Sequence, residues 1–186
     1  MKNFFMFLVV SSSLFAATNR ISNIKDIYSN VKESIYLNGE ERKKEYTIEY
    51  VAQDYLRKEM SLPNVNKGEI FQYENGESYQ YIPLFNEVSK NKSEDVSNFL
   101  SIIKDLKIKD QNDKEFSENY YLEKIKEIKY KDAYTIKVKQ YRKINGYLLP
   151  IKMEIFEKNT KVAELHLENT KVNSGLKRKE LKKWNL

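Results

Sequence analysis

Apolar and polar residues alternate with a period of two along residues 45–50 and 56–62, which is the pattern of strands that bury one face. The segment Ala52-Gln53-Asp54 makes the turn between these two strands, and Pro63 ends the second one. Because the connection is so short, the two strands are expected to be antiparallel neighbours in one sheet.

A second hairpin follows in residues 70–73 and 78–82, which flank the dipeptide Asn75-Gly76. This dipeptide is strongly preferred in two-residue hairpin turns. Within each strand the large residues share one parity, so we expect them to face the same side of the sheet. These large residues are Phe71, Tyr73, Tyr79 and Tyr81.

Two segments show a helical period instead. Apolar residues lie three and four positions apart in residues 21–31, which predicts an amphipathic helix packed against the sheet. The same spacing in residues 94–106, after the capping residue Ser93, predicts a second helix. Polar residues 109–119 are predicted to form a loop, whereas residues 120–130 are ambiguous between helix and strand.

Strand patterning resumes in residues 134–138, 151–155 and 162–168, with turns at Asn145-Gly146 and Lys158-Asn159. The predicted order is therefore one helix, about four strands, a second helix and three or four further strands. Such an order indicates an α+β domain whose helices pack on one face of a curved antiparallel sheet.

The first 17 residues have the pattern of a cleavable signal peptide, with Lys2 before an apolar stretch and cleavage after Ala16 or Ala17. An uncleaved anchor helix is the alternative, but the apolar run is about half of the ~20 residues that span a bilayer. We therefore expect residues 18–186 to form a single domain, exported to the periplasm and soluble after cleavage.

Composition narrows the class further. The chain has no cysteine, so disulfides, thiolate metal sites and a lipid-modified cysteine anchor are all ruled out. The whole chain carries a net charge of +6, and its densest basic cluster is the C-terminal segment 177–183. Such a cluster suits anionic lipid or a solvated chain end, and nucleic acid is not expected as a partner after export.

Candidate catalytic residues are few. His166, the only histidine, lies on the polar side of a strand and holds no metal on its own. The five glycines fall mostly in turns and leave no phosphate-binding loop. A glycosidase-type carboxylate pair is the remaining alternative, although the acidic residues follow solvent-facing parity. We expect no enzyme, no metal site and no cofactor.

Aromatic residues are the strongest lead, since the chain has 14 tyrosines and 9 phenylalanines. Two interpretations stand at this point. The aromatic faces of the strands pack shut against the helices as an ordinary core, or a curved sheet leaves room there for an apolar guest.

Four segments carry a resemblance to a known family. They are residues 52–63, Glu74 to Pro83, Leu149-Pro150-Ile151, and residues 168–176, in that order along the chain. Their order resembles that of the LolA-like family of periplasmic lipoprotein carriers, whose relatives include LolB and the sigma-factor regulator RseB. This resemblance implies an incomplete antiparallel β-barrel with a helical lid, which holds the acyl chains of lipoproteins in its hollow.

The resemblance also has departures. Ala52 and Gln53 stand where the family's carriers place a lid-latching arginine and a proline, and Lys58 stands where an aromatic often lines the hollow. The missing cysteine argues against the role of the lipid-anchored LolB.

The function expected from the resemblance is a monomeric carrier that shuttles lipoproteins or lipids from an inner-membrane donor towards an outer-membrane acceptor. The alternative is an RseB-like sensor or adaptor acting on a membrane partner through the basic tail. The residues expected to contact acyl chains are Tyr46, Ile48, Tyr50, Leu56, Met60, Phe71, Tyr73, Tyr79 and Tyr81 from the sheet, with Phe99 and Ile103 from the lid.

Overall fold

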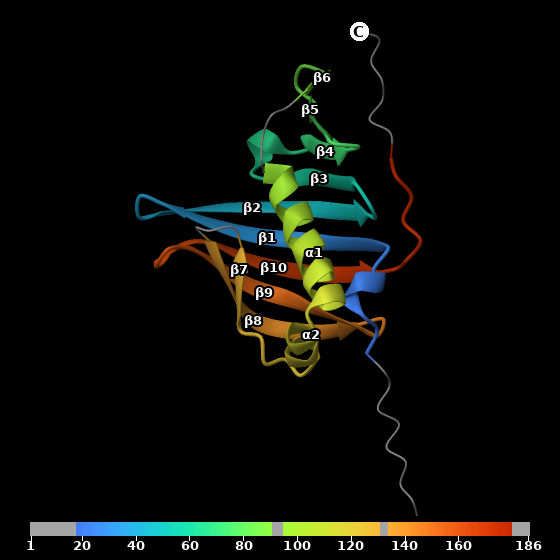
Figure 1. The fold of residues 1–186 in the computed structure, drawn as a ribbon. Coiled ribbons are helices and arrows are strands. Elements are labelled where there is room, and N and C mark those ends of the chain that lie inside the picture. The colour runs from blue at the N-terminus through green and yellow to red at the C-terminus, as the bar shows by residue number, and fades with distance from the viewer. Residues whose placement is uncertain (1–17, 91–94, 131–133, 180–186) are drawn as a thin grey trace, which may run out of the picture.

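The computed structural model describes residues 18–90, 95–130 and 134–179 (Figure 1). The predicted signal peptide, residues 1–17, therefore lies outside the described residues, as do Lys182 and Lys183 of the basic tail.

Within the described residues, ten antiparallel strands form one sheet in the order β6-β5-β4-β3-β2-β1-β10-β9-β8-β7. The first and last strands, β1 and β10, pair with each other and join two meanders, so the sheet runs open from β6 to β7 (Figure 1). The strands are β1 Asp26–Leu37, β2 Glu40–Val51, β3 Tyr55–Leu62, β4 Ile70–Glu74, β5 Glu77–Ile82, β6 Glu87–Lys90, β7 Glu127–Tyr130, β8 Tyr134–Ile144, β9 Tyr147–Glu157 and β10 Thr160–Val172.

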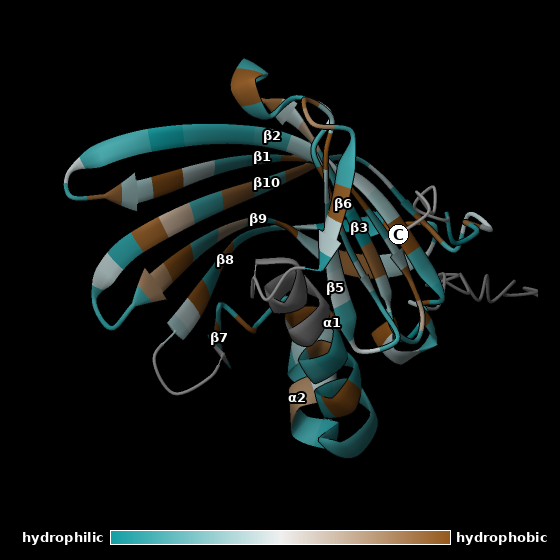
Figure 2. Cartoon of the chain, turned by 90° about the horizontal axis from the view of Figure 1, so that it is seen from above, coloured by the Kyte–Doolittle hydropathy of each residue, from teal (hydrophilic) through white to brown (hydrophobic). Residues whose placement is uncertain are grey.

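Two helices follow β6: α1 spans Asp95–Asn112 and α2 spans Lys114–Tyr121. Figure 2 shows that the sheet curves and that both helices lie inside the curve. We call the face of the sheet that packs on α1 the inner face and the opposite one the outer face. The predicted curved, open sheet with helices on one face is thus confirmed.

The predicted helix over residues 21–31 is wrong. Only Ile21–Asn23 form a short 3-10 turn, η1, and the chain then enters the long strand β1. The spacing of Ile27, Ser29 and Val31 fits a strand equally well, and all three are buried on the inner face. Pairing with both β2 and β10 outweighs the local helical period, because a central strand satisfies its backbone on two sides.

The predicted loop at residues 109–119 is also wrong, since α1 continues to Asn112 and α2 begins at Lys114. Asp113 was the misleading signal. Its side chain accepts a hydrogen bond from the Phe116 amide at 2.8 Å and so caps α2 instead of opening a loop. Residues 111–115 and Glu118 are exposed to solvent, while Asp110, Ser117 and Tyr120 are buried.

Candidate functional site

Cross-strand registers place seven of the predicted contact residues together on the inner face. One row joins Val31, Tyr46 and Met60, and another joins Tyr50, Leu56 and Tyr73. In the row between these two, β2 contributes Ile48 and β4 contributes Phe71. Those in contact with the inner-face core are Tyr46, Ile48, Tyr50, Leu56, Met60, Phe71 and Tyr73.

Tyr79 and Tyr81 do not join this set. Tyr79 pairs with Gln72, and Tyr81 pairs with Ile70, on the outer face. The turn that carries Asn75-Gly76 has two residues, so odd positions on β4 lie beside even positions on β5. The sequence alone could have predicted this, because a two-residue turn fixes the register of β4 with β5 and therefore the face on which Tyr79 and Tyr81 lie.

The other half of the inner face comes from β8, β9 and β10, none of whose residues was among the predicted contacts. Ile151 is fully buried, and Met153, Leu165 and Leu167 are buried as well. The alternation at 151–155 and 163–167 was visible in the sequence, but only the pairing of β10 with β1 shows that both halves meet over one helix.

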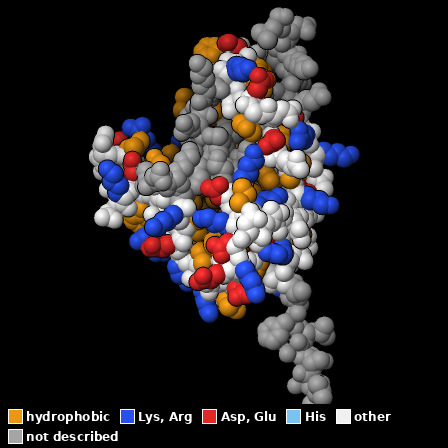
Figure 3. Space-filling view, viewed as in Figure 1, with side chains coloured by type: hydrophobic (Ala, Val, Ile, Leu, Met, Phe, Trp, Pro, Cys, Tyr) orange, Lys and Arg blue, Asp and Glu red, His pale blue; other side chains and the backbone are white. Residues whose placement is uncertain are grey.

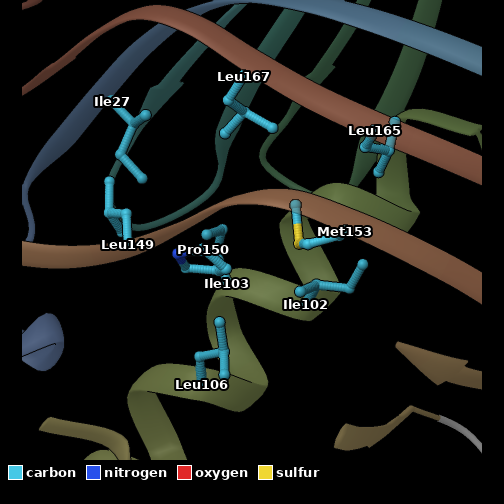
Figure 4. A pocket seen from close by; sticks show the side chains of 9 residues that line it. All are labelled: Ile27, Ile102, Ile103, Leu106, Leu149, Pro150, Met153, Leu165 and Leu167. Carbon is cyan, nitrogen blue, oxygen red and sulfur yellow. The ribbon is translucent and has the colours of Figure 1, made fainter. Parts of the chain in front are cut away.

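A small cavity lies between α1 and this second half (Figure 4). Its free volume is about 20 Å³, enough for about one water molecule. Ile103, one of the two predicted lid residues, lines it, whereas the side chain of Phe99 is outside the described part of the chain. The lining consists of Ile27, Ile102, Ile103, Leu106, Leu149, Pro150, Met153, Leu165 and Leu167, all of them apolar.

The C-terminal half of α1 is held by a buried carboxylate. Asp110 is 1% exposed and accepts hydrogen bonds from the Ser22 amide at 3.0 Å, the Ser117 hydroxyl at 2.8 Å and the Tyr121 hydroxyl at 3.0 Å. Burial alone would raise the pKa of Asp110, but these hydrogen bonds outweigh it, so the pKa lies below its ordinary value. Asp110 therefore ties η1, α1 and α2 together as a charged acceptor.

Two lysines fasten the middle of α1. The Lys104 ammonium lies 2.6 Å from the Asp54 carboxylate, and the Lys107 ammonium donates to the Ile24 carbonyl at 2.8 Å. Asp54 belongs to the turn that also contains Ala52 and Gln53. The cation that joins helix to turn thus comes from the helix, and the turn supplies the carboxylate.

The start of the basic tail is docked on the outer face. Asp26, which is 5% exposed, accepts hydrogen bonds from the Ser174 and Gly175 amides and so turns the chain back over the sheet. Arg178 then pairs with Glu74 at 3.4 Å, and Lys179 pairs with Glu49. These two basic groups are consequently engaged within the molecule.

The described residues contain no cluster of three or more His, Cys, Asp or Glu side chains that could hold a metal ion. His166 lies on β10 opposite Lys32, with its Nδ1 3.5 Å from Glu168. Charged side chains of both signs are interspersed on the face shown in Figure 3. In the part of the chain that the structure describes, neither helix is long and apolar enough to cross a membrane.

No family model and no curated protein match this sequence. Solved structures do match. A DUF1329 family protein from Desulfovibrio piger superposes with a TM-score of 0.55 at 12% identity, covering 84% of this chain and 89% of its own. A domain named for outer membrane lipoprotein sorting, from Vibrio parahaemolyticus, gives 0.54 at 10% identity, covering 82% and 87%.

A LolA superfamily protein from Nitrosomonas europaea gives a TM-score of 0.53 at 10% identity and covers 83% of this chain and 90% of its own. An open antiparallel sheet curved around an apolar helix interface is therefore the LolA-like fold. At these identities the similarity shows the fold alone, and the resemblance noted in the sequence is confirmed at that level.

Proposed function

We propose that this protein is a periplasmic carrier that binds the acyl chains of lipoproteins or lipids between α1 and the inner face and shuttles them between membranes. The LolA-like fold supports a role of this lipoprotein-sorting type. Binding and release of an apolar chain need no covalent step.

The observation that carries the proposal is the wholly apolar boundary of the cavity between α1 and the sheet. An acyl chain would gain about 0.8 kcal/mol for each buried methylene there, and no polar group of the lining would lose a partner. Because the free volume of this cavity is about 20 Å³, an acyl chain enters it only when α1 moves away from the inner face.

The contacts of α1 give that movement a direction. Asp110 and α2 fix the C-terminal half of the helix, whereas the described polar contacts of its middle are Lys104 with Asp54 and Lys107 with Ile24. We expect α1 to pivot about Asp110, lifting its N-terminal half away from β3 and β4 while η1 and α2 stay in place. Apolar side chains that separate from the sheet would then be covered by the ligand.

The first test places a charge in the cavity. Ile102 lines the cavity but is only partly buried, so Ile102→Glu is expected to fold and to weaken the binding of a fluorescent diacyl lipopeptide at least tenfold. Ile108 lies on the same helix, is 54% exposed and is not among the lining residues. Ile108→Glu is the matched control and should bind like the natural protein.

Binding is measured by titration of the lipopeptide and by its extraction from vesicles into the soluble fraction. The proposed function is overturned if the natural protein extracts no lipopeptide, or if Ile102→Glu and Ile108→Glu bind it equally well.

A second prediction concerns the ion pair between α1 and the β2–β3 turn. Lys104 and Asp54 are both about two-fifths exposed, so their pairing contributes at most ~1 kcal/mol to stability. Lys104→Ala should therefore leave the unfolding midpoint almost unchanged and accelerate lipopeptide uptake by up to about fivefold. Stopped-flow fluorescence measures the rate, and Lys114→Ala, which breaks the exposed pair with Glu118, is the control. Equal rates in the two variants would contradict a restraining role for Lys104.

The sensor alternative has less support. It relied on the basic tail for contact with a membrane partner, but Arg178 and Lys179 are paired with Glu74 and Glu49 on the outer face.

A further inference from the structure

The outer face of β4, β5 and β6 carries an apolar patch that is separate from the core. Tyr81 on β5 pairs with Ile70 on β4 and with Val88 on β6, and Tyr79 shares the parity of Tyr81. All four residues are partly exposed, and none of them belongs to the core of the inner face or packs against it. We call Ile70, Tyr79, Tyr81 and Val88 the outer patch.

Within the described residues, no helix covers the outer patch. Figure 2 shows that both helices lie inside the curve, which is the opposite side of the sheet. The hydroxyl groups of Tyr79 and Tyr81 already donate to Glu77 and to Asn86, so the patch offers a partner mainly the apolar faces of its rings. A contiguous apolar surface of this kind is typical of a site where another segment packs.

The described part of the C-terminal segment leads towards this patch. Its contacts move across the outer face from one strand to the next, and the Lys179 amide donates to the hydroxyl of Tyr55 at 3.1 Å. Figure 1 shows the segment in red, rising beside the ends of these strands. The residues that residues 174–179 contact are, in strand order, Asp26 on β1, Glu49 on β2, Tyr55 on β3 and Glu74 on β4.

The only tryptophan of the chain, Trp184, is close enough in sequence to reach the patch. It lies five residues beyond Lys179, and five residues span up to about 17 Å. Tyr79 lies two strands and two residues away from Tyr55, which is about 12 Å in an ordinary sheet. The indole can therefore lie over the rings of the outer patch while Lys179 stays bound at Tyr55.

The charges of the two surfaces are also complementary. Lys182 and Lys183 precede Trp184 in the sequence. On the sheet, Glu59 lies beside Ile70, and Glu77 shares the face of Tyr79. The side chains of both acids are nearly half exposed, so each can accept a second cation besides its partner on the sheet.

We infer that residues 180–186 dock on the outer patch, with the Trp184 indole packed on the rings of Tyr79 and Tyr81. The C-terminal segment is then an intramolecular strap that crosses the outer face from Asp26 to β6 and covers its apolar surface. This docking concerns the outer face alone, so it holds or fails independently of acyl-chain binding on the inner face.

Trp184 is its own probe, because the chain contains no other tryptophan. A docked indole is shielded from water, so acrylamide should quench its fluorescence about threefold less effectively than that of free N-acetyltryptophanamide. Its emission should also lie at a shorter wavelength. Both values should be independent of protein concentration, because the strap and the patch belong to the same molecule.

Two variants remove different parts of the patch. Tyr81→Ala and Val88→Ser each change a side chain outside the core, so both should fold, and each should increase the quenching of Trp184 at least about twofold. Tyr36→Ala is the matched control, because Tyr36 is also partly buried on the outer face but lies on β1, away from the patch. It should quench like the natural protein.

Three results would overturn the docking. Quenching of the natural protein equal to that of the free amide would mean that Trp184 is not covered. Equal protection in Tyr81→Ala, Val88→Ser and Tyr36→Ala would mean that the indole packs elsewhere. Protection that is lost on dilution would assign the covered patch to the segment of a second copy.

Discussion

A short covalent bridge between α1 and the sheet is expected to block acyl-ligand uptake. Ile102 on α1 and Met153 on β9 line the same cavity (Figure 4), and the natural chain contains no cysteine. The double variant Ile102→Cys, Met153→Cys therefore carries only the two introduced thiols. Bridging them with a short bifunctional methanethiosulfonate fixes α1 on the inner face, and uptake of the diacyl lipopeptide should fall more than tenfold.

The physical reason is the size of the cavity. A free volume of about 20 Å³ accommodates no acyl chain, so binding in this cavity requires α1 and the sheet to separate. Cleaving the bridge with a reductant should restore uptake in the same sample, and each single-cysteine variant treated with the reagent controls for its bulk. Undiminished uptake by the bridged protein would show that the ligand binds elsewhere and that α1 is not a lid.

Much of the sheet could be predicted from the sequence, because alternation and two-residue turns are local properties. The hairpin at Asn75-Gly76 and the end of β3 at Pro63 are confirmed. The segment at residues 21–31 could not be assigned locally, since its apolar residues satisfy a helical spacing and a strand spacing together. Long-range pairing of β1 with β10 decides between them.

The residues of the candidate site could likewise be predicted only in part. The aromatic residues of β2–β4 were predictable, because each strand's parity identifies its buried face. Leu165 and Leu167 on β10, which line the cavity, required knowledge that the last strand returns beside the first. The extent to which Lys58 is buried was also unpredictable, because its neighbours Ile48 and Phe71 come from two other strands.

Removing the Asp110 carboxylate should destabilise the fold more than any of the other substitutions proposed for this protein. Asp110→Ala leaves the Ser22 amide and the hydroxyls of Ser117 and Tyr121 without their acceptor inside the protein. A buried donor left without an acceptor costs about 1–3 kcal/mol, so the loss of this shared acceptor should cost at least that much. Asp105→Ala is the matched control, since Asp105 is exposed on the same helix and should change the free energy of unfolding by less than ~0.5 kcal/mol.

The pH dependence distinguishes a charged acceptor from a merely space-filling residue. Hydrogen bonding to the ionised form holds the folded-state pKa of Asp110 below its ordinary value of 3.8. The stability this provides is therefore complete above pH 3.8 and is lost as pH falls through the lower folded-state pKa. Urea unfolding of the natural protein and of Asp110→Asn should differ by a constant amount between about pH 5 and 7, and the difference should shrink below pH 3.8. The carboxylate does not anchor the helices if the difference stays constant at low pH, or if Asp110→Ala and Asp105→Ala are equally stable. In either case α1 would lack the fixed point about which it is proposed to open.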